Sequence, residues 1–194
     1  MLGVILCGGQ STRMGTDKAM MKTQGNTWAE CAGEKLAALD IPVVFSVNSK
    51  QYAEYAAILD PSTLVVDNTN LTLRGPVCAM LTLHKYAPME DLFILACDMP
   101  LVEQTLLNKL YQIYKENSLA DAFFYVNTEE PEPLCAIYTA RGLAQINYLY
   151  LNNKLVKHSM KFMLENLKTM PVIIADNELR CFTNFNSHAE LNGF

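Results

Sequence analysis

The sequence has few charged residues and no apolar run long enough to cross a membrane. Charged side chains make up 18% of the chain, whereas a membrane-spanning helix needs about 20 consecutive apolar residues. The first residues carry no cationic segment, so no signal peptide is predicted. The net charge is −5, so the chain does not have the excess of Lys and Arg with which nucleic-acid-binding proteins bind phosphate backbones. We expect a soluble protein that binds neither membranes nor nucleic acid.

Metal-binding and disulfide patterns are also missing. The six cysteines include no C-x-x-C pair, and neither they nor the three histidines have the spacing of zinc ligands. Cys7, Cys97 and Cys135 lie in or beside apolar runs, where a free cysteine behaves as a small hydrophobic residue. Reduced, structural cysteines of this kind indicate a cytoplasmic protein.

The chain alternates between strand-like and helix-like segments. At 194 residues it is predicted to be a single domain, 1–194, with a substantial core. Apolar runs predict strands at 3–6, 43–47, 64–66, 92–96, 122–126, 135–138 and 172–174. Spacing near 3.6 predicts helices at 28–39, 77–86 and 101–114, and 127–133 is expected to be a surface loop. This order predicts an α/β fold, with one doubly wound, mostly parallel sheet and helices on both faces.

The most informative stretch is residues 6–18, which read Leu-Cys-Gly-Gly-Gln-Ser-Thr-Arg-Met-Gly-Thr-Asp-Lys. It follows the first predicted strand, and ligands of such sheets bind at the carboxyl ends of the strands. Gly8 and Gly9 let the backbone turn and approach a ligand, while Arg13 and Lys18 add positive charge, as a phosphate site requires. A glycine pair after a strand is also commonly a simple turn. The stretch matches neither G-x-x-x-x-G-K-[ST] nor G-x-G-x-x-G.

Asp98 stands directly after another predicted strand, in the sequence Cys97-Asp98-Met99-Pro100. One interpretation is a helix cap, because Asp favours helix starts and Pro suits the first turn. The other is a Mg²⁺ ligand, because Mg²⁺ binds one or two carboxylates together with substrate phosphates. From the residues alone both interpretations stand.

Asn184 and Asn186 form a third polar feature, because they alternate with apolar neighbours. On a strand both side chains would point to one face, where amides could bind a pterin edge or a phosphate. The alternative is a turn and cap before a short helix at 188–191.

The stretch 6–18 resembles the nucleotidyltransferase signature L-A-G-G-x-[ST]-x-R-M-G-x-D-K, and most closely that of the MobA-type molybdenum cofactor guanylyltransferases. Cys7 stands where that family usually has Ala. The stretch 74–80 is similar to the family's G-P-L-A-G-M, 97–100 to its C-D-x-P, 132–138 to [HE]-P-[TL]-x-A, and 182–187 to F-x-N-x-N-T-P. The resemblance extends from residue 3 to about residue 191.

The resemblance implies a Rossmann-like nucleotidyltransferase fold and transfer of GMP from GTP to molybdopterin, with Mg²⁺ as cofactor. It also implies partners among molybdenum cofactor biosynthesis proteins and acceptor molybdoenzymes. The residues implied are catalytic Arg13, Lys18 and Asp98, of which Asp98 holds the metal; GTP-binding Leu6, Cys7, Gly8, Gly9, Lys18, Ser46, Asp67 and Asp98; and molybdopterin-binding Asn184 and Asn186. For Asp67, a solvated loop carboxylate is the alternative.

Two other functions are considered. A sister enzyme could use CTP, or a sugar phosphate as acceptor, because no residue of the chain selects guanine. A nucleotide-binding sensor without catalysis is a further alternative. The presence of Arg13, Lys18 and Asp98 argues against a sensor, because a sensor could tolerate the loss of the metal ligand.

Overall fold

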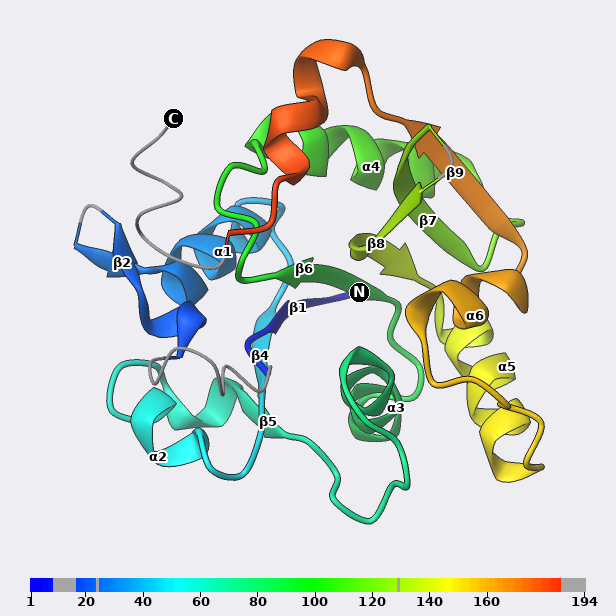
Figure 1. Ribbon diagram of the computed structural model, residues 1–194, viewed down its shortest axis with the longest axis horizontal. Coiled ribbons are helices and arrows are strands. Elements are labelled where there is room, and N and C mark those ends of the chain that lie inside the picture. Colours follow the sequence, from blue (N-terminus) through cyan, green and yellow to red (C-terminus); the bar gives the residue numbers. More distant parts are fainter. Residues whose placement is uncertain (9–16, 24, 129, 186–194) are drawn as a thin grey trace.

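A seven-stranded sheet forms the centre of the protein (Figure 1). The structure, a computed structural model, describes residues 1–8, 17–23, 25–128 and 130–185. Within them the strand order is β5-β4-β1-β6-β8-β7-β9. β8 pairs antiparallel with both of its neighbours, and all other pairings in this sheet are parallel. The predicted mostly parallel α/β sheet is therefore confirmed.

The strands of the sheet lie close to the predicted positions. Their bounds are β1 Leu2–Leu6, β4 Val43–Val47, β5 Leu64–Val66, β6 Leu92–Ala96, β7 Ala122–Asn127, β8 Glu130–Tyr138 and β9 Thr169–Ile173. The short strands β2 (Lys22–Thr23) and β3 (Asn26–Thr27) form a separate antiparallel pair. β1 and β6 are buried along their whole length, which explains why they are continuous apolar runs in the sequence.

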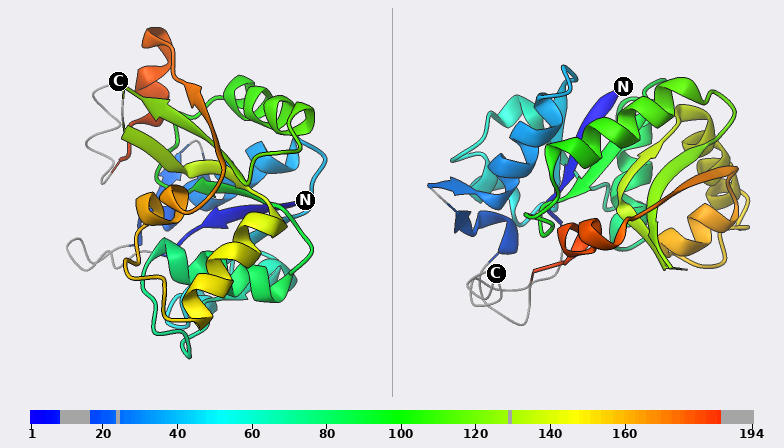
Figure 2. Two further views of the ribbon diagram at one scale, coloured as in Figure 1. Left: turned by 90° about the vertical axis from the view of Figure 1, so that its right-hand side faces the viewer. Right: turned by 90° about the horizontal axis from the view of Figure 1, so that it is seen from above.

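Helices cover both faces of the sheet, as Figure 2 shows. One hydrophobic cluster joins the sheet to α1 (Trp28–Ala37) and α4 (Gln104–Glu116). A second cluster joins its other face to α3 (Pro76–Tyr86), α5 (Ala140–Leu151) and α6 (Met160–Glu165). The short α2 (Tyr52–Tyr55) contacts β5. No helix among the described residues is long and apolar enough to span a membrane.

α1 packs closely against the central strands. A capping box begins the helix, because the Thr27 hydroxyl accepts from the Glu30 amide while the Glu30 carboxylate accepts from the Thr27 amide. A Cβ at Gly33 would lie 2.8 Å from Phe45 Cζ of β4. The absence of a side chain at this position therefore sets how near α1 lies to the sheet.

The structure corrects one sequence prediction, the loop at 127–133, and excludes one of the interpretations left open at each of Asp98 and Asn184. The segment 127–133 is not a surface loop, because β8 begins at Glu130 and pairs with β7. Its two prolines are tolerated because this part of β8 extends past the paired residues of β6 and is free on that side. Asp98 caps no helix, since α4 begins only at Gln104. Asn184 lies on no strand; it follows a 3-10 helix, Asp176–Phe182.

The strand order reverses at β1. The chain proceeds from β1 to β4 and β5 on one side and then returns to β6 on the other. Ligands of open α/β sheets bind outside the carboxyl ends of the strands at such a switch point. The carboxyl edge at β1 and β6 is therefore where a site is expected.

Candidate active site

The carboxyl edge of the sheet collects most of the sequence-predicted site residues that the structure describes. β1 ends at Leu6 and leads to Cys7 and Gly8, while Ser46 lies near the end of β4. Asp67 directly follows β5, and Asp98 lies in the turn after β6. Gly9, Arg13 and Asn186 lie outside the described residues. The parallel order of these strands thus brings together residues far apart in the sequence.

Lys18 and Asp98 form the charged part of this site. Lys18 opens a short 3-10 helix, Lys18–Met20, whose N-cap is Asp17. Burial raises the pKa of the Asp98 carboxyl, and the nearby positive charge of Lys18 lowers it in part. A carboxyl whose pKa is shifted by burial and by a nearby charge is typical of functional sites.

Asp67, Ser46 and Gly8 form a second group at the same edge. The buried Ser46 hydroxyl donates to Asp67 Oδ1 over 2.8 Å. Burial raises the pKa of the Asp67 carboxyl, while the bond from Ser46 lowers it in part. A Cβ at Gly8 would lie 3.6 Å from Asp67 Oδ2, so the exposed Gly8 backbone and this carboxylate border the same space.

The backbone at the end of β1 is tied to both neighbouring strands. The Cys7 amide donates to Ser46 O over 3.0 Å, and the Cys97 amide donates to Leu6 O over 3.3 Å. A hydrogen bond with Cys7 and burial raise the pKa of the Cys97 thiol. All six cysteines are free, and Cys7, Cys97 and Cys135 are buried, as predicted for small core residues. Leu6 and Cys7 are buried, so only their backbone groups could face a nucleotide.

The segment after the last 3-10 helix returns to the site, as the red end of the ribbon in Figure 1 shows. The amide of the buried Phe185 donates to Asp98 O over 2.9 Å. The exposed Asn184 therefore stands one residue from a direct contact with the Asp98 turn. The structure thus brings Asn184 near Asp98, although it does not place it on a strand.

Sequence reasoning missed three residues that support Lys18. The Asp17 carboxylate accepts from Ala19 N, from Gln51 Nε2 and from the Tyr55 hydroxyl. Asp17 is part of the motif 6–18 but was given no role. Nothing near Gln51 or Tyr55 in the sequence could reveal these bonds, because each joins α2 or its N-cap to a residue more than 30 positions earlier.

The donor set suits a magnesium ion that the substrate also binds. No group of three or more His, Cys, Asp or Glu side chains able to hold a metal occurs among residues 1–8, 17–23, 25–128 and 130–185. A fully protein-bound metal is therefore not supported there. Mg²⁺, however, commonly binds one or two carboxylates with phosphates and water. The half-buried carboxylate of Asp98 fits this arrangement.

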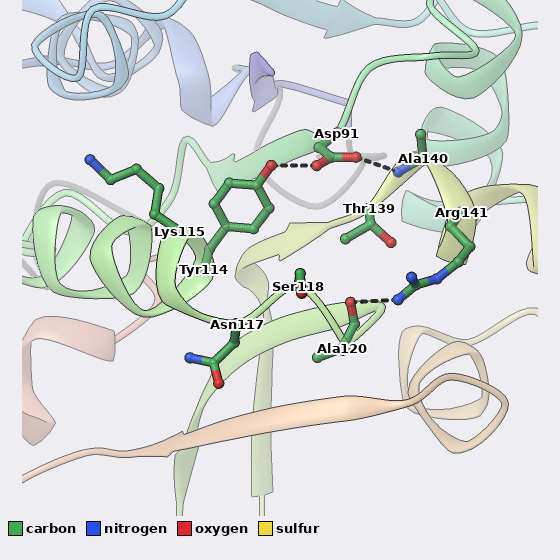
Figure 3. Close-up of a pocket in the computed structure, with 9 residues that line it drawn as sticks. All are labelled: Asp91, Tyr114, Lys115, Asn117, Ser118, Ala120, Thr139, Ala140 and Arg141. Atoms are coloured by element: carbon green, nitrogen blue, oxygen red, sulfur yellow. Dashed lines mark hydrogen bonds between the residues drawn. The ribbon is translucent and has the colours of Figure 1, made fainter.

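A pocket of about 540 Å³ lies at the opposite, amino edge of the sheet (Figure 3). Its central carboxylate, Asp91, accepts from the Tyr114 hydroxyl and from Ala140 N at the start of α5. Its cation, Arg141, pairs with Asp121 Oδ1 over 2.6 Å. These groups satisfy one another, so they hold α4, α5 and the sheet together rather than presenting reactive atoms.

Together the fold and the site are those of a nucleotidyltransferase: an α/β sheet whose switch point brings together the exposed Gly8, Lys18 and the half-buried Asp98. The chain belongs to the family described as the MobA-like NTP transferase domain, which matches residues 3–169.

Named relatives agree with this membership. The "Probable molybdenum cofactor guanylyltransferase" of Clostridium perfringens is 27% identical over 188 residues, covering 94% of this chain and 90% of the relative. The protein of the same name from a Geobacillus species is 30% identical over 149 residues, covering 77% and 75%. The crystal structure of molybdopterin-guanine dinucleotide biosynthesis protein A from Archaeoglobus fulgidus has a TM-score of 0.77 at 23% identity, covering 100% and 96%. That last likeness confirms the fold.

Proposed function

We propose that this nucleotidyltransferase transfers GMP from GTP to molybdopterin, giving molybdenum guanine dinucleotide and pyrophosphate. The observation that carries the proposal is the placement of Lys18 beside Asp98 at the switch point between β1 and β6. The names of the relatives support guanine as the base and molybdopterin as the acceptor.

The reaction needs no general base from the protein. A phosphate monoester has a second pKa of about 6 and is mostly ionised at pH 7. An oxygen of the molybdopterin phosphate attacks the α-phosphorus of GTP and forms a new P–O bond. The bond to the β-phosphate oxygen breaks, and pyrophosphate leaves with its electron pair. Catalysis then depends on alignment and on stabilisation of charge.

Each residue of the site has a part in this proposal. Lys18 stabilises the charge on the α-phosphate, and Arg13 with the amides of Gly8 and Gly9 holds the pyrophosphate. Asp98 holds Mg²⁺, which supplies charge neutralisation when bound.

The base and the acceptor occupy the two flanks of this centre. Leu6 and Cys7 contribute backbone groups to the base, and Ser46 and Asp67 line the nucleotide side. Asn184 binds molybdopterin, because it stands beside the residue that contacts the Asp98 turn; Asn186 is given the same role from the sequence resemblance. Guanine needs an acceptor for its N1–H and amino group, which the Asp67 carboxylate can supply.

The proposal also includes the cellular compartment, the protein partners and the domain organisation of the enzyme. Free cysteines throughout the chain support a reducing compartment, the cytoplasm. Acceptor molybdoenzymes and other proteins of molybdenum cofactor biosynthesis are the proposed partners. We propose that 1–194 forms one domain.

Transfer of the α-phosphate label tests the function directly. The purified protein is incubated with α-³²P-GTP, Mg²⁺ and molybdopterin, and the dinucleotide and pyrophosphate are quantified. Equal yields of both products are expected, with little product from CTP. Lys18→Ala should lower the activity about 10²- to 10³-fold, the cost typical of removing a charge-stabilising group, whereas Lys22→Ala, which alters an exposed lysine of β2, should retain it. Product formed preferentially from CTP would establish the cytidylyl alternative instead.

A further inference from the structure

The segment that follows β4 contains two side chains that bind Asp17, the residue directly before Lys18. Gln51 is the N-cap residue of α2, and Tyr55 is the last residue of that helix. Gln51 Nε2 and the Tyr55 hydroxyl both donate to Asp17 Oδ2. Tyr55 is completely buried, so its hydroxyl has a fixed position rather than a solvated one.

Gln51 also binds the end of β1. Its Nε2 donates to Cys7 O over 3.3 Å as well as to Asp17. Its Oε1 accepts from Asn48 N over 3.0 Å, so all of the polar atoms of this amide are engaged. The Gln51 side chain therefore links Cys7, the residue after β1, to Asp17, the residue before Lys18.

Asp17 passes this constraint on to Lys18. Its other oxygen, Oδ1, accepts from Ala19 N over 3.1 Å and caps the 3-10 helix that begins at Lys18. The backbone of Lys18 is thus held between a bonded carboxylate and a capped helical turn. Lys18 is the first residue of this turn, in which Met20 N donates to Asp17 O and Met21 N donates to Lys18 O. A shift of Asp17 would therefore move the backbone that carries the Lys18 side chain.

We propose that Gln51 and Tyr55 are positioning residues, which act through Asp17 to hold Lys18 at the place where the α-phosphate binds. The proposal rests on the proposed function only for the role of Lys18. The proposal also explains how the segment that follows β4 is connected to the phosphate-binding part of the site. β4 contains Ser46, which lines the nucleotide side, so the same hydrogen bonds would fix the position of Lys18 relative to the nucleoside of one bound nucleotide.

A double-mutant cycle tests the proposal. Gln51→Ala and Tyr55→Phe are each made in the wild type and in a Lys18→Ala background, and GTP–Mg²⁺ affinity and kcat are measured. In the wild type each change should lower kcat about 10- to 100-fold, the size expected for a misplaced group. In the Lys18→Ala background neither change should cause a further loss. Equal losses in both backgrounds, or no loss in the wild type, would overturn the proposal.

Controls separate positioning from folding. Tyr52→Phe removes the exposed hydroxyl of another α2 tyrosine and should change neither kcat nor affinity. Thermal unfolding midpoints identify any variant that loses activity through instability; the conservative Tyr55→Phe then decides the outcome.

A structural measurement keeps the result distinct from failure of the proposed function. Affinity for GTP–Mg²⁺ needs no molybdopterin, so the cycle can be completed even if another acceptor is used. A crystal structure of Gln51→Ala should show Lys18 displaced relative to Asp98, whatever the substrate. An unchanged position of Lys18 in that structure would refute the positioning role even if the guanylyltransferase activity is confirmed.

Discussion

The two edges of the central sheet differ in how their carboxylates are partnered. At the amino edge, Asp91 accepts from Tyr114 and Ala140, and Arg141 pairs with Asp121 (Figure 3). At the carboxyl edge, burial raises the pKa of both Asp67 and Asp98.

A raised pKa means that burial destabilises the charged form of a carboxyl group. A bound cation or metal ion offsets that destabilisation. The comparison indicates that the amino edge stabilises the fold, whereas the carboxyl edge is kept ready for a ligand.

The largest expected effect is loss of activity at the carboxyl edge. Asp98→Asn removes the proposed metal ligand and should lower kcat about 10²- to 10³-fold, the cost typical of removing a preorganised charge-stabilising group. Steady-state kinetics with GTP, Mg²⁺ and molybdopterin measure this. Full turnover by the variant would refute the metal assignment.

A change at the amino edge should lower stability and leave the turnover number unchanged. Asp91→Ala leaves the Ala140 amide and the Tyr114 hydroxyl without their acceptor, so the free energy of unfolding should fall by about 1–3 kcal/mol. Urea denaturation measures the change. The turnover number should be the same as in the wild type, and a large drop in kcat of the folded variant would show that this edge also takes part in the reaction.

Two glycines sharpen the comparison. A Cβ at Gly142 would lie 2.8 Å from Asp121 O, whereas for one at Gly8 the nearest contact among the described residues is Asp67 Oδ2 at 3.6 Å. Gly142→Ala should therefore destabilise the fold by about 1–3 kcal/mol.

Gly8→Ala should unfold like the wild type but bind GTP about tenfold more weakly, equal to about 1.4 kcal/mol, because the methyl group blocks close approach of a phosphate to the backbone. Calorimetric titration and thermal unfolding separate the two effects. Unchanged GTP affinity in Gly8→Ala would remove this backbone from the site.

The smallest effect concerns pH. Because the folded-state pKa of Asp67 is raised, the folded protein holds this proton more tightly than the unfolded chain. The stability from this group is complete below the unfolded pKa and is lost as pH rises through the folded pKa. Asp67→Asn should consequently raise the unfolding midpoint of the ligand-free protein at pH 7, and the gain should vanish in acid. A lower midpoint at pH 7 would contradict the sign.

Local pattern sufficed for the buried parts of the fold. β1 and β6 were predictable because both faces of these strands are buried, which leaves continuous apolar runs. The first part of β8 was not predictable, because its prolines at 131 and 133 are typical of loops. They are tolerated in the strand because this part of β8 pairs with β7 but extends past the residues that pair with β6.

The site divides in the same way. Asp98 was found because it directly follows an apolar strand, and the structure removes the helix-cap alternative. The support that Gln51 and Tyr55 give to Asp17 could not be predicted, because it depends on how α2 packs against the end of β1. Gly9, Arg13 and Asn186 lie outside the described residues, so their roles rest on the sequence.

The most direct test of the account is thermal unfolding with GTP and Mg²⁺ in three proteins: wild type, Lys18→Ala and Asp91→Ala. A ligand that binds only the folded state stabilises it by about 2.7 kcal/mol at a hundredfold excess over Kd. We predict a clear rise in midpoint for the wild type and for Asp91→Ala, and a much smaller rise for Lys18→Ala. A rise that is undiminished in Lys18→Ala but disappears in Asp91→Ala would place the nucleotide at the amino edge and contradict the account.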